Sequence, residues 1–330
     1  WVNRELTGRA CMEAGDASGT GFFDVRTRTF DVRAMDAIDA RLAACVPELV
    51  SHDAAIGTLR DDVARELGLP IDVLVSPGGG DNMMSAIGAA ATRPGVFVIS
   101  LGTSATAFAH SDTPVIDPDG LIAPFCGSTG GWLPLLCTMN ATGVLEEVRA
   151  HAPAPNDHAS LTERASRIEP GCGGVIFVPY IQGERVPDLP NATGSIHGVR
   201  AGSLDPAVLY RAAIEGVTLN LAWGIERMRA LGIRVDAVRL VGGGARNPLW
   251  RQVIADVLDA PVTALEEIET AALGAAIQAA TVCGSNGERL EDFSAIAAGD
   301  GVATHKPRTE AAKSYRAALV AFRRIVERTR

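Results

Sequence analysis

Three segments of this chain share one plan, in which a short apolar run ends in a glycine-rich turn, and this plan constrains the fold most strongly. They read IDVLVSPGGGDN, GVFVISLGTSATAF and VDAVRLVGGGARN. Apolar runs of this length predict buried strands, and the glycines mark the points where the chain turns. Helical patterns follow the first segment, from about Met83 to Ala91, and the third, after Asn247. Strands that alternate with helices predict an α/β fold with largely parallel sheets.

The second segment differs from the other two. Its residues alternate on both sides of Gly102-Thr103, which predicts two strands that fold back as a hairpin. Farther along the chain, apolar spacing predicts a strand in PVTAL and helices at Pro206 to about Leu231, Thr270 to about Val282 and Thr309 to Arg328. ATRPG, residues 91–95, predicts a domain boundary because a helix must end before its proline, and HAPAPNDHA, residues 151–159, predicts a surface loop.

Composition narrows the class of partner. The chain has 330 residues, of which 47% are hydrophobic, enough for two domains with their own cores. A net charge of -9 without a run of five or more like charges argues against nucleic acid and anionic membranes, and no apolar run is long enough to span a bilayer. Six cysteines without a Cys-x-x-Cys pair predict reduced thiols in a cytoplasmic protein. We therefore expect small-molecule partners, and leave a homodimer open.

The glycine turns do not fit the common nucleotide or hydrolase motifs. Met83 and Asn247 stand where a dinucleotide fingerprint needs its third glycine. Lys306 and Lys313, the only lysines, are far from any Walker A position. GTSAT lacks the closing glycine of a nucleophile elbow, and no histidines and cysteines have the spacing of zinc ligands.

Glycine turns at strand ends can still cradle an anion, because main-chain amides come close to a ligand there. The LGTS turn would offer amides and hydroxyls to phosphates, and GGGARN a backbone shelf for adenine or ribose. The alternative is that they are ordinary turns of an α/β sheet. Asp81 likewise has two interpretations: a helix N-cap, or an ionised acid that accepts a proton from a substrate hydroxyl.

A further loop, YIQGERVP, residues 180–187, combines an aromatic residue, a carboxylate and an arginine after a strand. The simplest interpretation is a surface salt bridge, which contributes little to stability.

Taken together, GGGDN, SLGTS, YIQGERVP, GSIHGV, AAIEGV and LVGGGARNPLWRQVIAD resemble, in this order, the FGGY carbohydrate kinases, and most of all the xylulokinases among them. The resemblance spans nearly the whole chain. It implies an actin-like ATPase (ribonuclease H-like) fold, with two domains around a cleft. We expect residues 1–92 to be the C-terminal part of the first, sugar-binding domain, and residues 93–330 to be the second, ATP-binding domain. The first domain is expected to be incomplete, because the family's first phosphate loop, with its aspartate for magnesium, is not found in the sequence.

The resemblance also implies the site. Asp81 matches the catalytic base and Asn82 the residue beside the sugar. Gly102, Thr103 and Ser104 match the phosphate turn; Gly143 resembles a glycine near the nucleotide; Gly243, Gly244, Ala245 and Asn247 match the adenosine turn. ATP and Mg2+ are the implied cofactors, with no metal ligand identified in this chain. The implied reaction is phosphorylation of D-xylulose to D-xylulose 5-phosphate, and the alternatives are a kinase of gluconate or another polyol, or a non-catalytic nucleotide-binding regulator.

Overall fold

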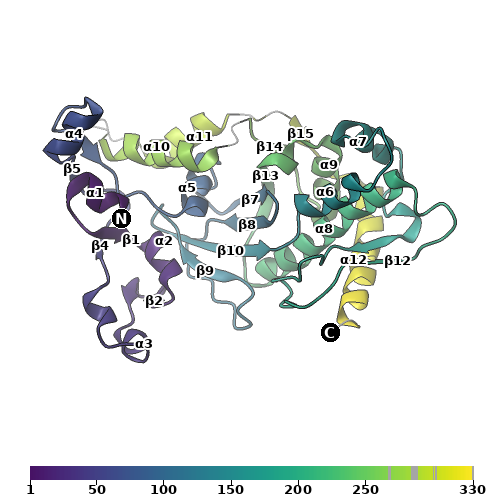
Figure 1. The fold of residues 1–330 in the computed structure, drawn as a ribbon, viewed down its shortest axis with the longest axis horizontal. Coiled ribbons are helices and arrows are strands. Elements are labelled where there is room, and N and C mark those ends of the chain that lie inside the picture. The colour runs from purple at the N-terminus through teal and green to yellow at the C-terminus, as the bar shows by residue number, and fades with distance from the viewer. Residues whose placement is uncertain (267–268, 284–288, 300, 302, 329–330) are drawn as a thin grey trace.

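The computed structural model describes residues 1–330 except 267–268, 284–288, 300, 302 and 329–330. Its centre is one seven-stranded sheet with the order β15-β14-β13-β7-β8-β10-β9 (Figure 1). The strands are β7 (Gly95–Leu101), β8 (Ala105–Ala109), β9 (Ala123–Cys126), β10 (Trp132–Thr138), β13 (Val235–Val241), β14 (Val262–Ala264) and β15 (Ala303–His305). Within this sheet β13 pairs in parallel with β7 and β14, and the other pairs are antiparallel. The expectation of a largely parallel sheet is therefore wrong here: short turns join β7 to β8 and β9 to β10, which imposes antiparallel pairing on both hairpins, and the two hairpins meet in a third antiparallel pair, β8–β10.

Helices cover both faces of this sheet (Figure 1). One face carries α6 (Thr142–Ala150), α8 (Pro206–Ala230), α9 (Pro248–Leu258) and α12 (Thr309–Glu327), with α7 (His158–Ser166) packed against α8; the other carries α5 (Asp81–Gly88), α10 (Thr270–Cys283) and α11 (Leu290–Ala298). The alternation along β7 explains this arrangement. Phe97 and Ile99 join the core with α8, whereas Val98 joins the core with α5. The predicted hairpin and long helices are confirmed, with ends shifted by a residue or two.

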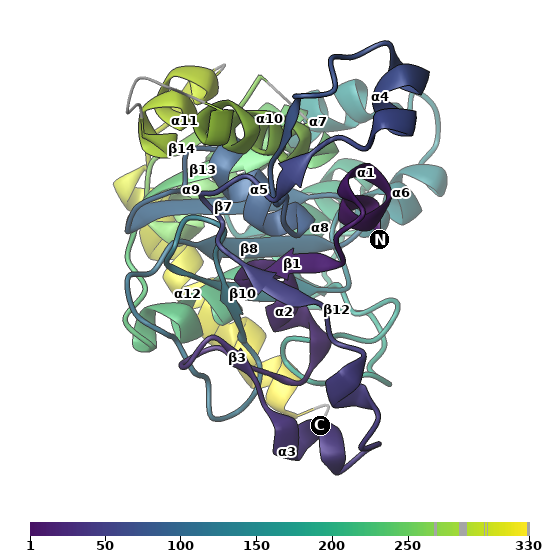
Figure 2. The ribbon, with the colours of Figure 1, turned by 90° about the vertical axis from the view of Figure 1, so that its left-hand side faces the viewer.

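The chain before α5 forms small elements at one end of the molecule, and Figure 2 faces that end. They are α1 (Val2–Thr7), β1 (Cys11–Glu13), α2 (Ala14–Ala17), β2 (Phe23–Asp24), β3 (Thr29–Phe30), α3 (Val32–Asp36), β4 (Glu48–Val50), β5 (Gly57–Thr58), α4 (Asp61–Leu67) and β6 (Leu74–Val75). Their strands form three two-stranded sheets, of which β1-β4 is parallel. A further two-stranded sheet pairs β11 (Ile176–Val178) with β12 (Ser195–His197). Among the described helices, none is long and apolar enough to cross a bilayer.

Helix α5 packs directly on α10, and two glycines make this contact possible. A Cβ on Gly274 would lie 1.8 Å from the carbonyl oxygen of Met84, and a Cβ on Gly88 would lie 2.0 Å from that of Thr270. The hydroxyl groups of Ser85 and Thr270 are 2.7 Å apart across the same contact. Backbones this close leave no room to slide. The helix that begins at Asp81 is therefore held firmly against a helix from much later in the chain.

Candidate functional site

The turn between β7 and β8, residues 102–104, is exposed and is held from both sides. Inside the turn, the Gly102 amide donates to the Ser104 carbonyl at 3.0 Å. The Gly102 carbonyl accepts from the amide and hydroxyl of Thr142, at 3.0 and 2.8 Å, and the Thr103 carbonyl accepts from the Ala141 amide at 3.0 Å. The Gly102 amide is thus occupied within the turn, and a ligand would meet the exposed residues Thr103 and Ser104.

The start of α6 lies against this turn. Gly143 is in the first turn of α6, and its amide donates to the Thr103 carbonyl at 3.4 Å. A Cβ at Gly143 would lie 3.3 Å from Cγ2 of Thr103, so a larger residue would press on the turn. Gly143, which is distant in sequence from residues 102–104, is therefore brought into contact with them.

The glycine turn after β13 lies beside the same turn. Gly242 has φ +85, where glycine is favoured, and a Cβ there would lie 2.8 Å from the Leu101 carbonyl oxygen. A Cβ at Gly244 would lie 2.8 Å from Leu101 Cβ and 3.1 Å from both Thr142 and the Trp250 ring. Ala245 is buried behind them. The two glycine turns and the start of α6 thus meet at the ends of the adjacent parallel strands β7 and β13.

Asn247 links this turn to α9. Its side-chain oxygen accepts from the amides of Leu249 and Trp250, at 3.0 and 3.1 Å, and so caps the helix. Its side-chain nitrogen donates to Thr162 at 2.9 Å and to the Tyr210 hydroxyl at 3.5 Å. These four bonds use the full hydrogen-bonding capacity of the amide. Asn247 therefore shapes the turn, and its backbone and carbon atoms are what a ligand would touch.

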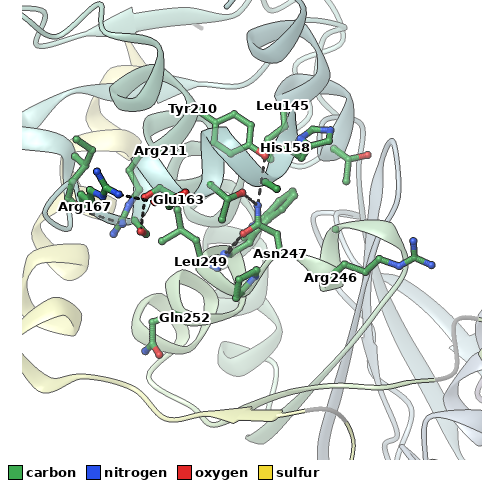
Figure 3. A pocket seen from close by; sticks show the side chains of 18 of the residues that line it. Leu145, His158, Glu163, Arg167, Tyr210, Arg211, Arg246, Asn247, Leu249 and Gln252 are labelled. Carbon is green, nitrogen blue, oxygen red and sulfur yellow. Dashed lines mark hydrogen bonds and ion pairs between the residues drawn. The ribbon is translucent and has the colours of Figure 1, made fainter. Parts of the chain in front are cut away.

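A pocket of about 1030 Å³ opens beside this turn, between α6, α7, α8 and α9 (Figure 3). Its lining includes Thr142, Gly243, Gly244 and Asn247. The size suits a nucleotide-sized ligand. Asp81, Asn82 and residues 102–104 are not among the lining residues, so the pocket includes the glycine turn after β13 and the start of α6 but not the acid.

One wall of the pocket is a chain of polar side chains, and Figure 3 shows His158 and Tyr210 above Asn247. His158 shares hydrogen bonds with the Tyr210 hydroxyl at 2.8 Å and with the Glu146 carboxylate at 2.7 Å. The bonds from His158 and Arg149 lower the pKa of Glu146, while burial raises the pKa of Tyr210. At neutral pH Glu146 is therefore a carboxylate and Tyr210 a phenol, so the hydrogen bonds of His158 with both groups are kept.

Sequence reasoning missed this wall. The interpretation of residues 151–159 as a surface loop is wrong at its end, where His158 begins α7. Asp157 accepts from the Ser160 amide at 2.9 Å and caps that helix. An aspartate before a periodic segment was the signal that could have revealed it. Tyr210 lay within a predicted helix, but no pattern indicated the side to which its hydroxyl turns.

Asp81 is the first residue of α5 and is exposed. The interpretation of Asp81 as the helix cap is wrong, because Gly80 holds that position and no side chain caps α5. The carboxylate instead accepts from the amide and the side-chain nitrogen of Asn82, at 2.7 and 3.0 Å. The side-chain oxygen of Asn82 accepts from the Thr106 hydroxyl at 3.1 Å. This bond ties Asp81 and Asn82 to β8, two residues past Ser104.

Gly78, the first of the three glycines before Asp81, is bonded on both of its polar groups by one side chain from α10. The Gly78 amide donates to the Gln278 side-chain oxygen at 2.9 Å, and the Gln278 side-chain nitrogen donates back to the Gly78 carbonyl at 3.1 Å. Gln278 is 1% exposed, so this clamp is buried. The acid is thus delivered from a fixed turn on to the face of the sheet that carries Thr106.

Comparison with known proteins gives this geometry a context. Residues 1–88 match the N-terminal domain, and residues 97–283 the C-terminal domain, of the FGGY family of carbohydrate kinases. The xylulose kinase of Haemophilus influenzae is 40% identical over 89% of this chain and 59% of its own length. That of Streptomyces coelicolor is 36% identical over 85% of this chain and 55% of its own. The solved xylulose kinase of Rhodospirillum rubrum superposes with a TM-score of 0.89 at 25% identity, over 98% of this chain and 65% of that one.

These likenesses confirm the expected actin-like ATPase fold. The chain spans more than half, but less than two thirds, of the length of these relatives. The two matched ranges leave residues 89–96 between them, which contain the predicted boundary.

Proposed function

Because this chain belongs to the FGGY family of carbohydrate kinases, we propose that its protein transfers the γ-phosphoryl group of ATP to a hydroxyl of a ketopentose, D-xylulose, and yields D-xylulose 5-phosphate. The observation that carries the proposal is the placement of two elements along one β-hairpin. The nucleotide-type glycine turns gather at residues 102–104, and Asp81 is tied through Asn82 to Thr106, in the next strand. The choice of sugar follows the relatives, which are xylulose kinases.

In the proposed site, the pocket beside Gly243, Gly244 and Asn247 holds the adenosine, and its phosphates extend toward the turn at residues 102–104. Ala245 and Gly143 contribute by packing, since one is buried behind the turn and the other touches Thr103. We assign residues 1–92 to the sugar side and residues 93–330 to the ATP side. The acid would then come from one side and the phosphates from the other.

The proposed chemistry is an in-line phosphoryl transfer. The sugar hydroxyl oxygen forms a bond to the γ-phosphorus, and the bond from that phosphorus to the bridging oxygen breaks. ADP leaves with the electron pair of that bond, and the hydroxyl proton passes to the Asp81 carboxylate. The exposed position of Asp81 and its bond to Asn82 keep a carboxylate oxygen available for a substrate. Asn82 would orient the acid and contact the sugar.

We propose that Mg2+ accompanies the ATP. Over the ranges that the structure describes, no group of three or more His, Cys, Asp or Glu side chains is placed to hold a metal. The residues present therefore do not form a metal site by themselves, and we assign none of them as a ligand. Mg2+ is commonly held by substrate phosphates, waters and one or two carboxylates, where it neutralises phosphate charge. An ATP-consuming reaction on a free sugar is also consistent with the cytoplasm as the proposed location.

The experiment that tests this proposal is ADP release from magnesium-ATP by the full-length protein, with D-xylulose, gluconate, L-ribulose and glycerol at equal concentration. We expect D-xylulose to give the fastest release. A preference for gluconate or glycerol would replace the substrate but keep the kinase. ATP binding without a response to any of these sugars would contradict the proposal and favour a nucleotide-binding regulator.

A further inference from the structure

The loop that carries the sequence GERVP is built around a buried carboxylate. Glu184 is 2% exposed, and its two oxygens accept from the amides of Met139 and Arg185, both at 2.7 Å, and from the side chains of Asn140 and Asn220, both at 3.1 Å. Burial raises the pKa of Glu184, and the hydrogen bonds oppose that shift. Because all four partners are donors, the group fits this place as a carboxylate.

The glycine before Glu184 fixes the loop further. Gly183 has φ +69, and a Cβ there would lie 2.1 Å from the carbonyl oxygen of Pro190. The Gly183 carbonyl accepts from the Asn140 side chain at 2.6 Å. The contacts of Gly183 and Glu184 therefore fix the backbone just before Arg185. They also fix the direction in which the arginine side chain projects from the loop.

Arg185 itself is exposed. Its guanidinium contacts the Cys137 sulfur, 3.1 Å from Nη1, and a thiol is a weak acceptor. Across the ranges with described coordinates, no carboxylate forms an ion pair with Arg185. The surface salt bridge expected for this loop is therefore wrong: the carboxylate is buried and the arginine keeps donors for another anion.

The sheet register places Arg185 on the same face as the acid. Cys137 on β10 is directly opposite Thr106 on β8. Side chains of directly paired residues project to one face, with Cβ atoms about 4.5–5.5 Å apart. Thr106 is bonded to Asn82, which is bonded to Asp81. A cation and a carboxylate thus flank Cys137 and Thr106 on one face, beyond the turn at residues 102–104.

We propose that Arg185 is a catalytic residue that binds the phosphoryl group in transit between ATP and the sugar hydroxyl. This inference rests on the proposed function. The transferring group spreads negative charge over three equatorial oxygens, and a guanidinium offers a planar fork of donors that matches two oxygens at once. Glu184 is the positioning residue, since its contacts direct Arg185. A phosphoryl group held by Arg185 would lie on the face of the sheet on which Asp81 receives the proton.

Turnover of Arg185 variants gives the first test. In the full-length protein, Arg185→Ala should lower kcat about 10²-fold to 10³-fold, the range for loss of one donor to a transition-state oxyanion, with the KM for ATP changed far less. Arg185→Lys should recover only part of that loss because it keeps the charge but not the fork. Arg200→Ala is the matched control, because Arg200 is also an exposed arginine and lies shortly after β12 in the chain. An equal loss in Arg200→Ala, or full activity in Arg185→Ala, would overturn the assignment.

Two measurements exclude a merely structural effect. Guanidinium chloride at millimolar concentration should restore part of the turnover that Arg185→Ala loses. It should not raise the turnover of the wild type or of Arg200→Ala. Aluminium fluoride, a mimic of the transferring phosphoryl group, should tighten ADP binding by the wild type in the presence of D-xylulose, and this tightening should be lost in Arg185→Ala while binding of ADP alone persists. Should Arg185→Ala fail to fold, the same comparison is made with Arg185→Lys.

The aluminium fluoride result separates this inference from the proposed function. If none of the tested sugars is phosphorylated, the proposed function fails, and tightening that still depends on Arg185 supports a phosphoryl site. If D-xylulose is phosphorylated but the tightening is the same with and without the arginine, the function stands and the role of Arg185 is contradicted.

Discussion

The triplet Gly-Gly-Gly occurs twice in the chain, at residues 78–80 and 242–244. The polar residue that follows each triplet is exposed in one case and fully hydrogen-bonded in the other. Each triplet follows a strand, β6 or β13, and precedes a helix, α5 or α9. After the first, Asp81 leaves its carboxylate exposed. After the second, the Asn247 side-chain amide makes four hydrogen bonds, two that cap α9 and two to Thr162 and Tyr210. The same three glycines therefore precede an exposed carboxylate in one place and a backbone surface without a free polar side chain in the other.

The two triplets are also held differently. In the first, Gln278 on α10 bonds both polar groups of Gly78, and Gly79 lies close to Ser128 and Met84. In the second, Gly244 packs against Leu101 and Trp250, whereas Gly243 has open space beside it. The first turn is thus closed around its glycines and exposes the acid that follows them, and the second exposes part of its own backbone. If the first triplet serves the chemistry and the second nucleotide binding, substitutions at the two should impair different steps.

The largest effect is expected at the first triplet. Asp81→Asn should lower kcat about 10²-fold to 10⁴-fold, because the amide cannot take the hydroxyl proton, while ADP affinity stays within a few-fold. Steady-state turnover with D-xylulose and ADP titration measure the two. Asp72→Asn, another exposed acid of the same region, is the control. Near-normal turnover of Asp81→Asn would remove the first triplet from the chemistry.

Substitution of Gly244 in the second triplet should lower the free energy of unfolding. Gly244→Ala places a methyl group 2.8 Å from Leu101 Cβ, and such overpacking costs about 1–3 kcal/mol of unfolding free energy. Gly243→Ala is its matched partner, because a Cβ there has nothing within 4 Å. It should leave the free energy of unfolding nearly unchanged and weaken ADP binding by narrowing the pocket that it lines. Denaturant titration and ADP binding test both, and equal destabilisation by the two variants would contradict this division.

How far the sequence predicts these features depends on the range of the contacts involved. The hairpin at residues 102–104 and the helix at Pro206–Ala230 follow from local periodicity, so they could be predicted. The Gln278 clamp and the Arg185–Cys137 contact join residues far apart in the chain, and no local pattern reports them. Asp81 was identified as a candidate, but its exposure depends on Gly80 taking the cap position, which spacing alone does not decide. The largely parallel sheet was predicted wrongly for the same reason, because pairing is set by returns of the chain.

Loss of the Gln278 side chain and loss of the Asn247 side chain should affect kcat and ADP affinity differently. Gln278→Ala leaves the amide and carbonyl of Gly78 without their partner, which costs about 1–3 kcal/mol, and it should lower kcat more than ADP affinity because Asp81 loses its support. Asn247→Ala removes a helix cap, at a cost of about 0.5–2 kcal/mol, and should weaken ADP binding more than it lowers kcat. Denaturant titration, turnover and ADP binding measure these effects. The comparison breaks if the two variants change kcat and ADP affinity in the same proportion.

The smallest effects are expected on the hairpin that joins the two regions, where two threonines face different ways. Thr103 touches Gly143, whereas the Thr106 hydroxyl donates to Asn82. Loss of one hydrogen bond to a ligand changes affinity roughly threefold to tenfold, so Thr103→Ala should raise the KM for ATP by that factor and leave the KM for D-xylulose nearly unchanged. Thr106→Val should do the reverse, because it frees Asn82 at the proposed sugar site. Steady-state titration of each substrate against the other gives both constants. If both variants shift both KM values equally, the hairpin acts as one rigid unit, and the separate roles of the two triplets do not extend into the hairpin.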